Sequence, residues 1–438
     1  MSGETTSPES RTAALEGVRG APDWLPPDSA GFDAVEAGFV RVVRLAGYER
    51  IRTPVFEHTE VFARGVGGST DIVQKEMYTF EDKGGRSLTL RPEGTAGVMR
   101  AALEHHLPKQ GNLPAKLWYA GSFYRHERPQ AGRQREFVQV GIEALGSEDP
   151  LLDAEVVVVG WDALAAVGAP QVRLLVNTMG HAGPDCRAAY VERLRTFLDG
   201  IDEQLCRECR RRKETNPLRV FDCKEEGCQA AIAEAPLLPD HVCDACRTHH
   251  ATVLAGLDDS GVPFEETPRL VRGLDYYTRT TFEYQSGVLG AQAAVGGGGR
   301  YDGLAEELGG ERFTGIGFAL GVDRTLLALR TADAALDAER RVETFIVAVG
   351  DARPAGFALA TELRRAGLAC DLAFDGKSFK AGMRQADRSG AATAVILGEQ
   401  ELAAGTVTVK HLGTGEQREV TRDAVLDAVR SPADDIPD

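Results

Sequence analysis

Residues 117–146 read LWYAGSFYRHERPQAGRQREFVQVGIEALG, and this stretch decides the fold expected for the first part of the chain. Strand-like runs lie on both sides of a short polar segment at residues 130–133, a pattern typical of two antiparallel strands joined by a loop. A strand would present Arg125 and Glu127 on the same face, because side chains alternate between the faces with a period of two. The stretch therefore predicts an antiparallel pair with functional side chains at its loop end.

The same stretch is locally basic. Between residues 121 and 135 a single acid, Glu127, stands against four arginines, which are Arg125, Arg128, Arg133 and Arg135. The arginine fork suits phosphate oxygens, so these residues predict an anion site. An exposed basic hairpin without a ligand is the alternative interpretation.

The residues before this pair extend the antiparallel pattern. EMYTFED and RSLTLR alternate apolar and polar residues around residues 83–85, which predicts another hairpin between residues 75 and 90. Residues 33–47 carry apolar side chains at helical spacing, and residues 48–55 are typical of a strand interrupted by Pro54. The first part of the chain is thus expected to be α+β with mainly antiparallel pairing.

The pattern changes twice further along the chain. Residues 172–268 are rich in charge, cysteine and short helical stretches, which indicates an insertion in the first domain. After residue 343, TFIVAVG, LACDLAF and TAVILG alternate with helical stretches and predict a separate α/β domain. The expected organisation is a disordered lead-in (1–17), a catalytic domain (18–332) that contains the insertion (172–268), a linker (333–342) and a C-terminal domain (343–438).

Composition excludes some classes of protein. The net charge is −16 and the pI is near 5.2 over 438 residues, which argues against coating nucleic acid through bulk charge. No run of about 18 apolar residues occurs, so no membrane span is expected. The first residues, MSGETTSPESRTAALEG, resemble neither a signal peptide nor a transit peptide, and we expect a cytoplasmic protein.

Three short segments are candidates for ligand contact. Residues 296–299 are all glycine, which would let a ligand approach the backbone closely, although a flexible loop is equally compatible. RGLDYY at residues 272–277 offers a guanidinium, a carboxylate and two phenols to a small polar heterocycle, with a plain strand as the alternative. RPEGT at residues 91–95 could contact a ligand or simply begin a helix.

Cysteines cluster in the insertion. Of the chain's 8 cysteines, all but Cys186 and Cys370 lie between residues 206 and 246. Their spacing supplies three thiol pairs, and two pairs suffice for a tetrahedral zinc site, while reduced structural cysteines are the alternative. We expect four of these six cysteines to bind zinc, and the spacing does not indicate which four; the candidates are Cys206, Cys209, Cys223, Cys228, Cys243 and Cys246.

Taken together and in order, these segments resemble the class II aminoacyl-tRNA synthetases, specifically the histidyl-tRNA synthetases, from about residue 18 to about residue 420. Residues 52–67 (RTPVFEHTEVFARGVG) resemble motif 1, residues 123–146 motif 2 and residues 315–329 (GIGFALGVDRTLLAL) motif 3. RGLDYY and GGGGRYDGL (296–304) resemble the two histidine-specific signatures. The resemblance implies an antiparallel catalytic sheet of six or seven strands, a dimer formed through motif 1 and a C-terminal anticodon-binding domain.

The resemblance also implies a reaction. Histidine would be activated with ATP and Mg²⁺ to histidyl-adenylate and pyrophosphate, and then transferred to the 3′ end of tRNA(His) with release of AMP. Arg272 and Arg125 would be catalytic, and ATP would bind to Arg125, Glu127, Phe137 and Arg324. The tRNA acceptor end would lie near Arg128, Gln130 and Arg133. Histidine would bind to Glu93, Gly94, Thr95, Gln139, Glu143, Tyr276 and Tyr277.

Two other functions remain open at this point. A synthetase-like regulatory subunit of ATP phosphoribosyltransferase would lack the anticodon domain, whereas KSFKAGMRQADRSGAATAVILGEQEL at residues 377–402 supplies one here. A class II synthetase for proline, threonine or glycine would lack RGLDYY and GGGGRYD. The cysteine-rich insertion is not part of the core pattern of the family, so zinc rests on the paired thiols alone.

Overall fold

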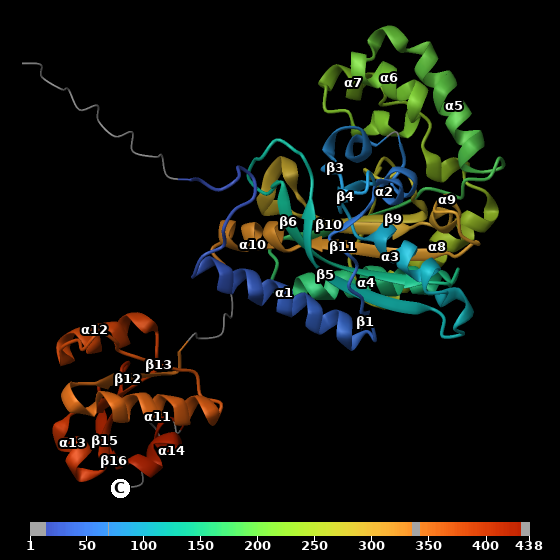
Figure 1. Ribbon diagram of the computed structural model, residues 1–438. Helices are drawn as coiled ribbons and strands as arrows, with labels where there is room; N and C mark the ends of the chain where they lie inside the picture. Colours follow the sequence, from blue (N-terminus) through green and yellow to red (C-terminus); the bar gives the residue numbers. More distant parts are fainter. Residues whose placement is uncertain (1–14, 69, 335–341, 431–438) are drawn as a thin grey trace, which may run out of the picture. The chain divides into compact units, whose positions relative to one another are not determined.

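The computed structural model describes residues 15–68, 70–334 and 342–430 (Figure 1). The chain divides into two compact units, residues 1–337 and 338–438, and each is described by itself. The predicted lead-in lies outside the described residues up to residue 14, and the predicted linker lies outside them from residue 335 to residue 341.

An eight-stranded sheet forms the centre of the first unit, in the order β1-β5-β6-β11-β10-β9-β7-β8. Its six inner strands pair antiparallel, as the sequence predicts, and only the two-residue edge strands pair parallel. The strands are β1 (Glu49–Arg50), β5 (Ala115–Tyr124), β6 (Glu136–Leu145), β7 (Val172–Thr178), β8 (Glu265–Glu266), β9 (Thr278–Ser286), β10 (Ala294–Arg300) and β11 (Gly315–Gly321).

Two details differ from the expected strands. The strand predicted for residues 48–55 is limited to β1, and the chain resumes extended pairing only after Pro54, in β2 (Phe56–His58). The glycine run 296–299 is not a loop but most of β10, paired on both sides. The predicted hairpin at residues 75–90 is confirmed as β3 (Thr79–Glu81) and β4 (Ser87–Leu90), which join β2 in a small sheet.

Helices cover one face of the large sheet and enclose its main core. These are α1 (Asp28–Leu45), α4 (Pro150–Ala166), α8 (Asp244–Asp259) and α10 (Val322–Thr331), and Figure 1 shows α1 and α4 side by side along the sheet. Alternation along β6 sends Val140 and Ile142 into this core. Gln139 and Glu143, at the odd positions, therefore face the opposite side of the sheet.

The opposite face is only partly covered. Helices α2 (Thr59–Gly65), α3 (Thr95–Glu104) and α9 (Leu304–Glu307) pack there, in a second core around Tyr119, Phe123 and Tyr301. The part of this face above β6, β10 and β11 stays open, and it holds the pocket described below.

Residues 172–178 and 265–266, at the ends of the expected insertion (172–268), form β7 and β8 of the large sheet, and the inserted part between them is helical. It contains α5 (Arg187–Gly200), α6 (Arg207–Thr215), α7 (Glu226–Ala231) and the start of α8, around a core that includes most of the chain's cysteines and Tyr190. Its two ends are joined by Asn177, whose Nδ2 donates to the carbonyl oxygens of Pro268 (3.1 Å) and Leu270 (3.0 Å). β7 pairs with β9, so the insertion lies between two neighbouring strands of the sheet.

The C-terminal unit has a five-stranded sheet in the order β13-β12-β14-β15-β16, parallel at β13-β12-β14 and antiparallel beyond. Its strands are β12 (Thr344–Ala348), β13 (Cys370–Leu372), β14 (Thr393–Leu397), β15 (Thr406–His411) and β16 (Gln417–Thr421), and its helices are α11 (Arg353–Arg365), α12 (Phe379–Ser389), α13 (Glu399–Ala404) and α14 (Val425–Arg430). Helices α11 and α12 pack in separate cores of this unit, as expected for an α/β sandwich. Throughout the described residues of the chain, every helix is too short or too polar to serve as a membrane span.

A buried ion pair joins the sheet of the first unit to its helices. Asp153 on α4 and Arg300 on β10 are both fully buried, and Arg300 Nε donates to both Asp153 carboxylate oxygens at 3.1 Å. His249 Nε2 lies 2.8 Å from Asp153 Oδ2, and Thr280 Oγ1 donates to the same oxygen at 2.6 Å. Burial alone would raise the pKa of Asp153, but the hydrogen bond from His249 and the Arg300 guanidinium outweigh it, and the net pKa is lowered.

Arg300→Met is expected to destabilise the protein by about 3–5 kcal/mol, because it leaves the Asp153 carboxylate buried without its cation. Arg312→Met is the control, since Arg312 pairs with Glu148 at 2.9 Å where both side chains are largely exposed, and its expected effect is below about 1 kcal/mol. Urea unfolding followed by circular dichroism measures both free energies. Equal effects of the two substitutions would contradict a structural role for the buried pair.

Candidate functional site

A pocket of about 340 Å³ opens on the uncovered face of the large sheet. Its walls come from the start of α3, the β5–β6 pair and its loop, the segment 272–277, and strands β9 to β11 with the start of α10. Most of the residues predicted for ligand contact meet in this one pocket: Glu93, Gly94, Thr95, Arg125, Glu127, Arg133, Phe137, Gln139, Arg272, Tyr276, Tyr277 and Arg324.

The floor of the pocket is bare backbone. A Cβ on Gly297, in the pocket lining, would lie 3.0 Å from Cζ of Arg272, and one on Gly299, beside the lining, would lie 2.7 Å from Cδ1 of Tyr277. A Cβ on Gly317 would lie 1.9 Å from Oε2 of Glu143. Side chains of the pocket therefore rest directly on β10 and β11, and only glycine fits at these positions.

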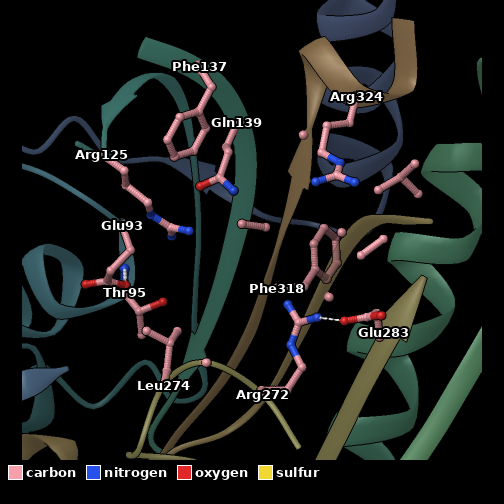
Figure 2. A pocket seen from close by; sticks show the side chains of 18 of the residues that line it. Glu93, Thr95, Arg125, Phe137, Gln139, Arg272, Leu274, Glu283, Phe318 and Arg324 are labelled. Carbon is pink, nitrogen blue, oxygen red and sulfur yellow. Dashed lines mark hydrogen bonds and ion pairs between the residues drawn. The ribbon is translucent and has the colours of Figure 1, made fainter. Parts of the chain in front are cut away.

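Arg272 is held on this floor by an ion pair. Its guanidinium pairs with Glu283 of β9, and Figure 2 shows the two side chains pointing toward each other across the pocket wall. Gln285 Nε2 donates to the other Glu283 oxygen at 2.8 Å and so fixes the carboxylate. The ion pair orients the guanidinium before any ligand arrives, which is the condition for electrostatic preorganisation.

Two further arginines approach the pocket from opposite sides. Arg125 Nε donates to the Pro92 carbonyl oxygen at 2.9 Å, and its guanidinium lies over the Phe137 ring, 5.3 Å from the centroid. Figure 2 shows Arg324 facing Arg125 and Phe137 across the open space. An anion between these groups would meet positive charge on both sides, and a flat ring would meet an aromatic face and a guanidinium plane.

Glu93 lies just before helix α3 and closes the pocket at one end. Its carboxylate accepts the backbone N–H of Thr95 (2.7 Å) and of Ala96 (2.9 Å), two donors left unpaired by the first helical turn. Burial raises the pKa of Glu93 although these donors act against the shift. Tyr276 Oη donates to the same carboxylate at 3.4 Å.

Glu143 lies deeper, beneath the pocket, and is fully buried. Its donors are all uncharged hydroxyls: Thr95 Oγ1 at 2.7 Å, Tyr119 Oη at 3.3 Å and Tyr301 Oη. Burial raises the pKa of Glu143 to about 8, so this carboxyl group holds its proton at neutral pH. Burial likewise raises the pKa of Tyr277 to about 12.

The structure adds residues that the sequence analysis missed. Tyr119, Glu283 and Tyr301 line the pocket, yet none of them was assigned a role from the sequence, although Tyr301 lies within GGGGRYDGL. Tyr301 comes two residues after the glycine run, and alternation along β9 places Glu283 on the pocket side, so position relative to a strand was the available signal. Arg128 and Gln130, predicted to contact the tRNA, lie exposed on the β5–β6 loop outside the pocket lining.

The cysteines of the insertion separate into two groups. Cys206, Cys209, Cys223 and Cys228 converge on one point, whereas Cys243 and Cys246 meet His181 and Cys186. Cys186 stands apart in the sequence and His181 lies at the end of the segment after β7, so spacing alone did not indicate either. The single four-ligand site expected from the sequence is replaced by two sets of possible ligands.

Comparison with known proteins places these features in a family. A family model described as "Histidyl-tRNA synthetase" matches residues 20–325, and one described as "Anticodon binding domain" matches residues 343–431. "Histidine--tRNA ligase" of Rhodococcus erythropolis is 51% identical over 95% of this chain and 98% of its own length. The protein of the same name from Mycobacterium marinum is 52% identical over 94% of this chain and 97% of its own length.

A solved structure agrees with the sequence matches. The crystal structure of the apo histidyl-tRNA synthetase of S. aureus superposes with a TM-score of 0.80 at 36% identity. The match covers 95% of this chain and 100% of that chain.

Glu143→Gln is expected to change how stability depends on pH. A group whose folded pKa is raised binds more protons in the folded state, so wild-type stability falls as pH rises between about 4.5 and about 8. The variant lacks this group, and its stability relative to wild type should rise with pH, by up to about 1.4 kcal/mol per unit. Thermal melts at pH 6 and pH 9 measure the difference.

Tyr301→Phe is the matched control for this measurement. It keeps the acid but removes a hydroxyl donor that lowers the pKa of Glu143, so the pH dependence of the wild type should persist and extend to higher pH. A stability difference between Glu143→Gln and wild type that is constant over the range would mean that the carboxyl group does not titrate there.

Proposed function

Because the chain belongs to the histidyl-tRNA synthetase family and is a ligase that forms histidyl-tRNA, we propose that this pocket is where histidine reacts with ATP. One observation carries the assignment: Arg125, Arg272 and Arg324 converge on one pocket that also holds buried carboxyl groups and phenols. Cations suit the phosphates of ATP, and paired acids and phenols suit the ammonium group and the imidazole of histidine. The near full-length matches to ligases do not support a regulatory subunit.

We propose that ATP lies between the two sides seen in Figure 2. Phe137 and Arg324 would hold the adenine ring between an aromatic face and a guanidinium plane. Arg125 would bind the α-phosphate, since its guanidinium is fixed by the Pro92 carbonyl and points into the pocket. Glu127, which pairs with Arg133 at 3.1 Å, would accept the adenine amino group.

Histidine would occupy the end of the pocket near α3. Glu93, Thr95 and Gln139 would bind the ammonium group, with Gly94 allowing close approach. The imidazole would lie against Tyr276 and Tyr277, above Glu143. Because Glu143 holds a proton at neutral pH, a neutral imidazole nitrogen can accept a hydrogen bond from this acid, and a side chain without such a nitrogen cannot.

Arg272 would act on the reacting atoms. The carboxylate of histidine attacks the α-phosphorus of ATP, an oxygen–phosphorus bond forms, and pyrophosphate leaves. Because the reactants and the leaving group are all anionic, alignment and charge neutralisation lower the barrier, and a guanidinium already held by Glu283 provides both without rearrangement. In the second step a ribose hydroxyl of the tRNA attacks the acyl carbon, and AMP leaves.

We propose that Mg²⁺ accompanies the ATP. Mg²⁺ usually binds through substrate phosphates, and in this pocket Arg133 engages the Glu127 carboxylate while Arg272 and Gln285 engage that of Glu283, so the phosphates of ATP would supply most of the ligands of the ion. Bound there, Mg²⁺ would neutralise phosphate charge.

We also propose where the tRNA binds. Arg128, Gln130 and Arg133 lie on the exposed loop at the mouth of the pocket, where the acceptor end must enter to reach the adenylate. The C-terminal unit, which matches the anticodon-binding model, would hold the other end of tRNA(His). The domain limits given above and the cytoplasmic location remain predictions from the sequence.

Histidine-dependent exchange of labelled pyrophosphate into ATP, with Mg²⁺ and without tRNA, tests the activation step. Arg272→Ala is expected to lower the exchange rate by about 10²–10³-fold, because it removes the charge that stabilises the transition state. Arg86→Ala is the control, since Arg86 lies exposed on the β3–β4 hairpin and pairs only with Asp82 among its described ion-pair partners. A folded Arg272→Ala protein with wild-type exchange would overturn the assigned role.

We propose that the chain acts as a dimer through the motif-1 segment. Val55, Phe56 and Phe80 are 42%, 52% and 43% exposed in the single chain, and the rings of Phe56 and Phe80 lie 6.3 Å apart on the small sheet. Such a group of exposed apolar side chains is typical of a surface that a partner covers.

Phe56→Glu is expected to weaken self-association, because it places a charge in the apolar interface. The dimer dissociation constant should rise at least about tenfold, equivalent to about 1.4 kcal/mol. Sedimentation velocity over a concentration series measures it. Phe357→Glu is the control, since Phe357 is 56% exposed but lies on the C-terminal unit. Unchanged association of Phe56→Glu would exclude this segment from the interface.

A further inference from the structure

The insertion contains two separate clusters of metal-ligating side chains. The first, called the four-cysteine cluster, consists of Cys206, Cys209, Cys223 and Cys228, and the second, called the mixed cluster, consists of His181, Cys186, Cys243 and Cys246. Within each cluster the ligand atoms all lie within 4.8 Å of one another. None of these residues lines the pocket for the reaction.

The distances fit tetrahedral zinc. Zinc–sulfur bonds of about 2.3 Å and zinc–nitrogen bonds of about 2.0–2.1 Å set neighbouring ligand atoms roughly 3.5–3.8 Å apart. In the four-cysteine cluster the Sγ atoms of Cys206 and Cys223 are 3.9 Å apart. In the mixed cluster Nδ1 of His181 lies 3.3 Å from Cys246 Sγ and 3.6 Å from Cys243 Sγ. The Cys206–Cys223 separation is too long for a disulfide, and the cysteines of both clusters are free, so each cluster leaves room for one ion at its centre.

Backbone donors point at the sulfur atoms. The N–H of Cys206 donates to Cys228 Sγ at 2.9 Å, and the N–H of Cys209 donates to Cys206 Sγ at 3.4 Å. The N–H of Cys243 donates to Cys186 Sγ at 3.5 Å. A thiolate accepts such bonds better than a thiol does, so the backbone is arranged for the charged form that binds metal.

His181 has the second partner that a zinc-bound histidine needs. Its Nε2 lies 3.2 Å from Oδ1 of Asp185, which accepts that N–H and leaves the lone pair of Nδ1 directed at the cysteines. A carboxylate behind the coordinating imidazole is a common feature of zinc sites, because it fixes the tautomer and raises the basicity of the ligand.

Packing of reduced cysteines is the simpler explanation, and Cys370 shows what it looks like in this chain. Cys370 is buried in the C-terminal unit, and its Sγ hydrogen bond goes to a backbone carbonyl, that of Asp371. The clustered cysteines instead bring three or four sulfur atoms to one point together with donors to sulfur. Burying that many thiols face to face gains nothing in packing that apolar side chains would not provide.

We propose that the insertion binds two zinc ions, one in the four-cysteine cluster and one in the mixed cluster. Their role is structural, since each cluster supplies four protein ligands and leaves no open position. The inference does not rest on the ligase reaction. It extends the single zinc site expected from the sequence to two sites, and it assigns His181 and Cys186 as ligands.

The site in the mixed cluster links the insertion to the reaction pocket. It joins the residues that follow β7 to the start of α8, whose His249 binds the buried Asp153. Arg187, next to the ligand Cys186, donates to the carbonyl oxygen of Tyr277 in the pocket wall.

The site in the four-cysteine cluster makes a second link. It fixes the start of α6, which ends beside Asn216. Asn216 Nδ2 donates to Asp275 Oδ1 at 2.8 Å, within the segment 272–277 that forms one wall of the pocket. Both proposed ions therefore hold elements that contact this segment.

Metal analysis of the full-length protein, purified without chelator, tests the proposal. We expect two zinc ions per chain in the wild type, one in Cys209→Ser, one in Cys246→Ser and none in the double variant. Cys370→Ser should keep two, because Cys370 lies outside both clusters. Fewer than two ions in the wild type, or loss of both ions from either single variant while it stays folded, would overturn the two-site assignment.

Two further measurements do not depend on whether cysteine variants fold. Thiol modification of the native wild type, mapped by peptide mass, should leave the clustered cysteines unmodified until a chelator is added, while Cys370 should react equally with and without it. Asp185→Asn should weaken only the site in the mixed cluster, by about 10–100-fold, in competition with a chromophoric chelator. Clustered cysteines that react at the same rate with and without chelator would contradict metal binding.

Discussion

The absence of Cβ atoms along β10 and β11 is the constraint on which the pocket depends. Four successive glycines in β10 and Gly317 in β11 let two strands, the segment 272–277 and Glu143 approach one another within van der Waals limits that no other residue permits. Strand β10 thereby stays paired with both β9 and β11, apart from register shifts toward β9 at each end of the glycine run, while its face toward the pocket carries no side chains at this place. The side chains of Arg272 and Tyr277 occupy the space that Cβ atoms on Gly297 and Gly299 would fill. The same glycines therefore determine how closely the strands pack and where the pocket side chains lie.

Two buried acids of the same domain show how environment decides charge. Asp153 is surrounded by a guanidinium, an imidazole and a hydroxyl, and its pKa is lowered in spite of its burial. Glu143 receives only hydroxyl donors, and its pKa rises to about 8. The first acid therefore anchors α4 to the sheet as an ion, and the second lies under the pocket as a neutral acid. A buried carboxyl group thus stabilises the packing of helix on sheet on one face, and on the other face it lies where a ligand can contact it.

The sequence predicted the antiparallel pairs and the C-terminal α/β unit, and most of its candidate ligand-contact residues line the pocket, because these features depend on local alternation and on ordered motifs. It could not choose among the cysteines, because Cys186 and His181 reach Cys243 and Cys246 only through the tertiary fold of the insertion. Glu283 was missed for the same reason, since its partner Arg272 precedes β9 and meets it only when the chain folds back. The sequence did not show that the glycine run is a strand, because glycine has a low strand propensity. Strand β10 forms because it pairs with β9 and β11 on its two sides.

The position of the insertion between β7 and β9 has a consequence for how the protein folds. Asn177 and Leu270, which hydrogen-bond at its two ends, are 93 residues apart, so the sheet pairs these strands only after that whole length has been synthesised. The equilibrium tolerates this separation well, because each doubling of a loop adds only about 0.6 kcal/mol of closure entropy. The rate is affected more, because long-range pairing slows folding. If the insertion first forms its own core, the loop between β7 and β9 is effectively shorter. Strand β9 can then pair with β7 after a smaller loss of chain entropy.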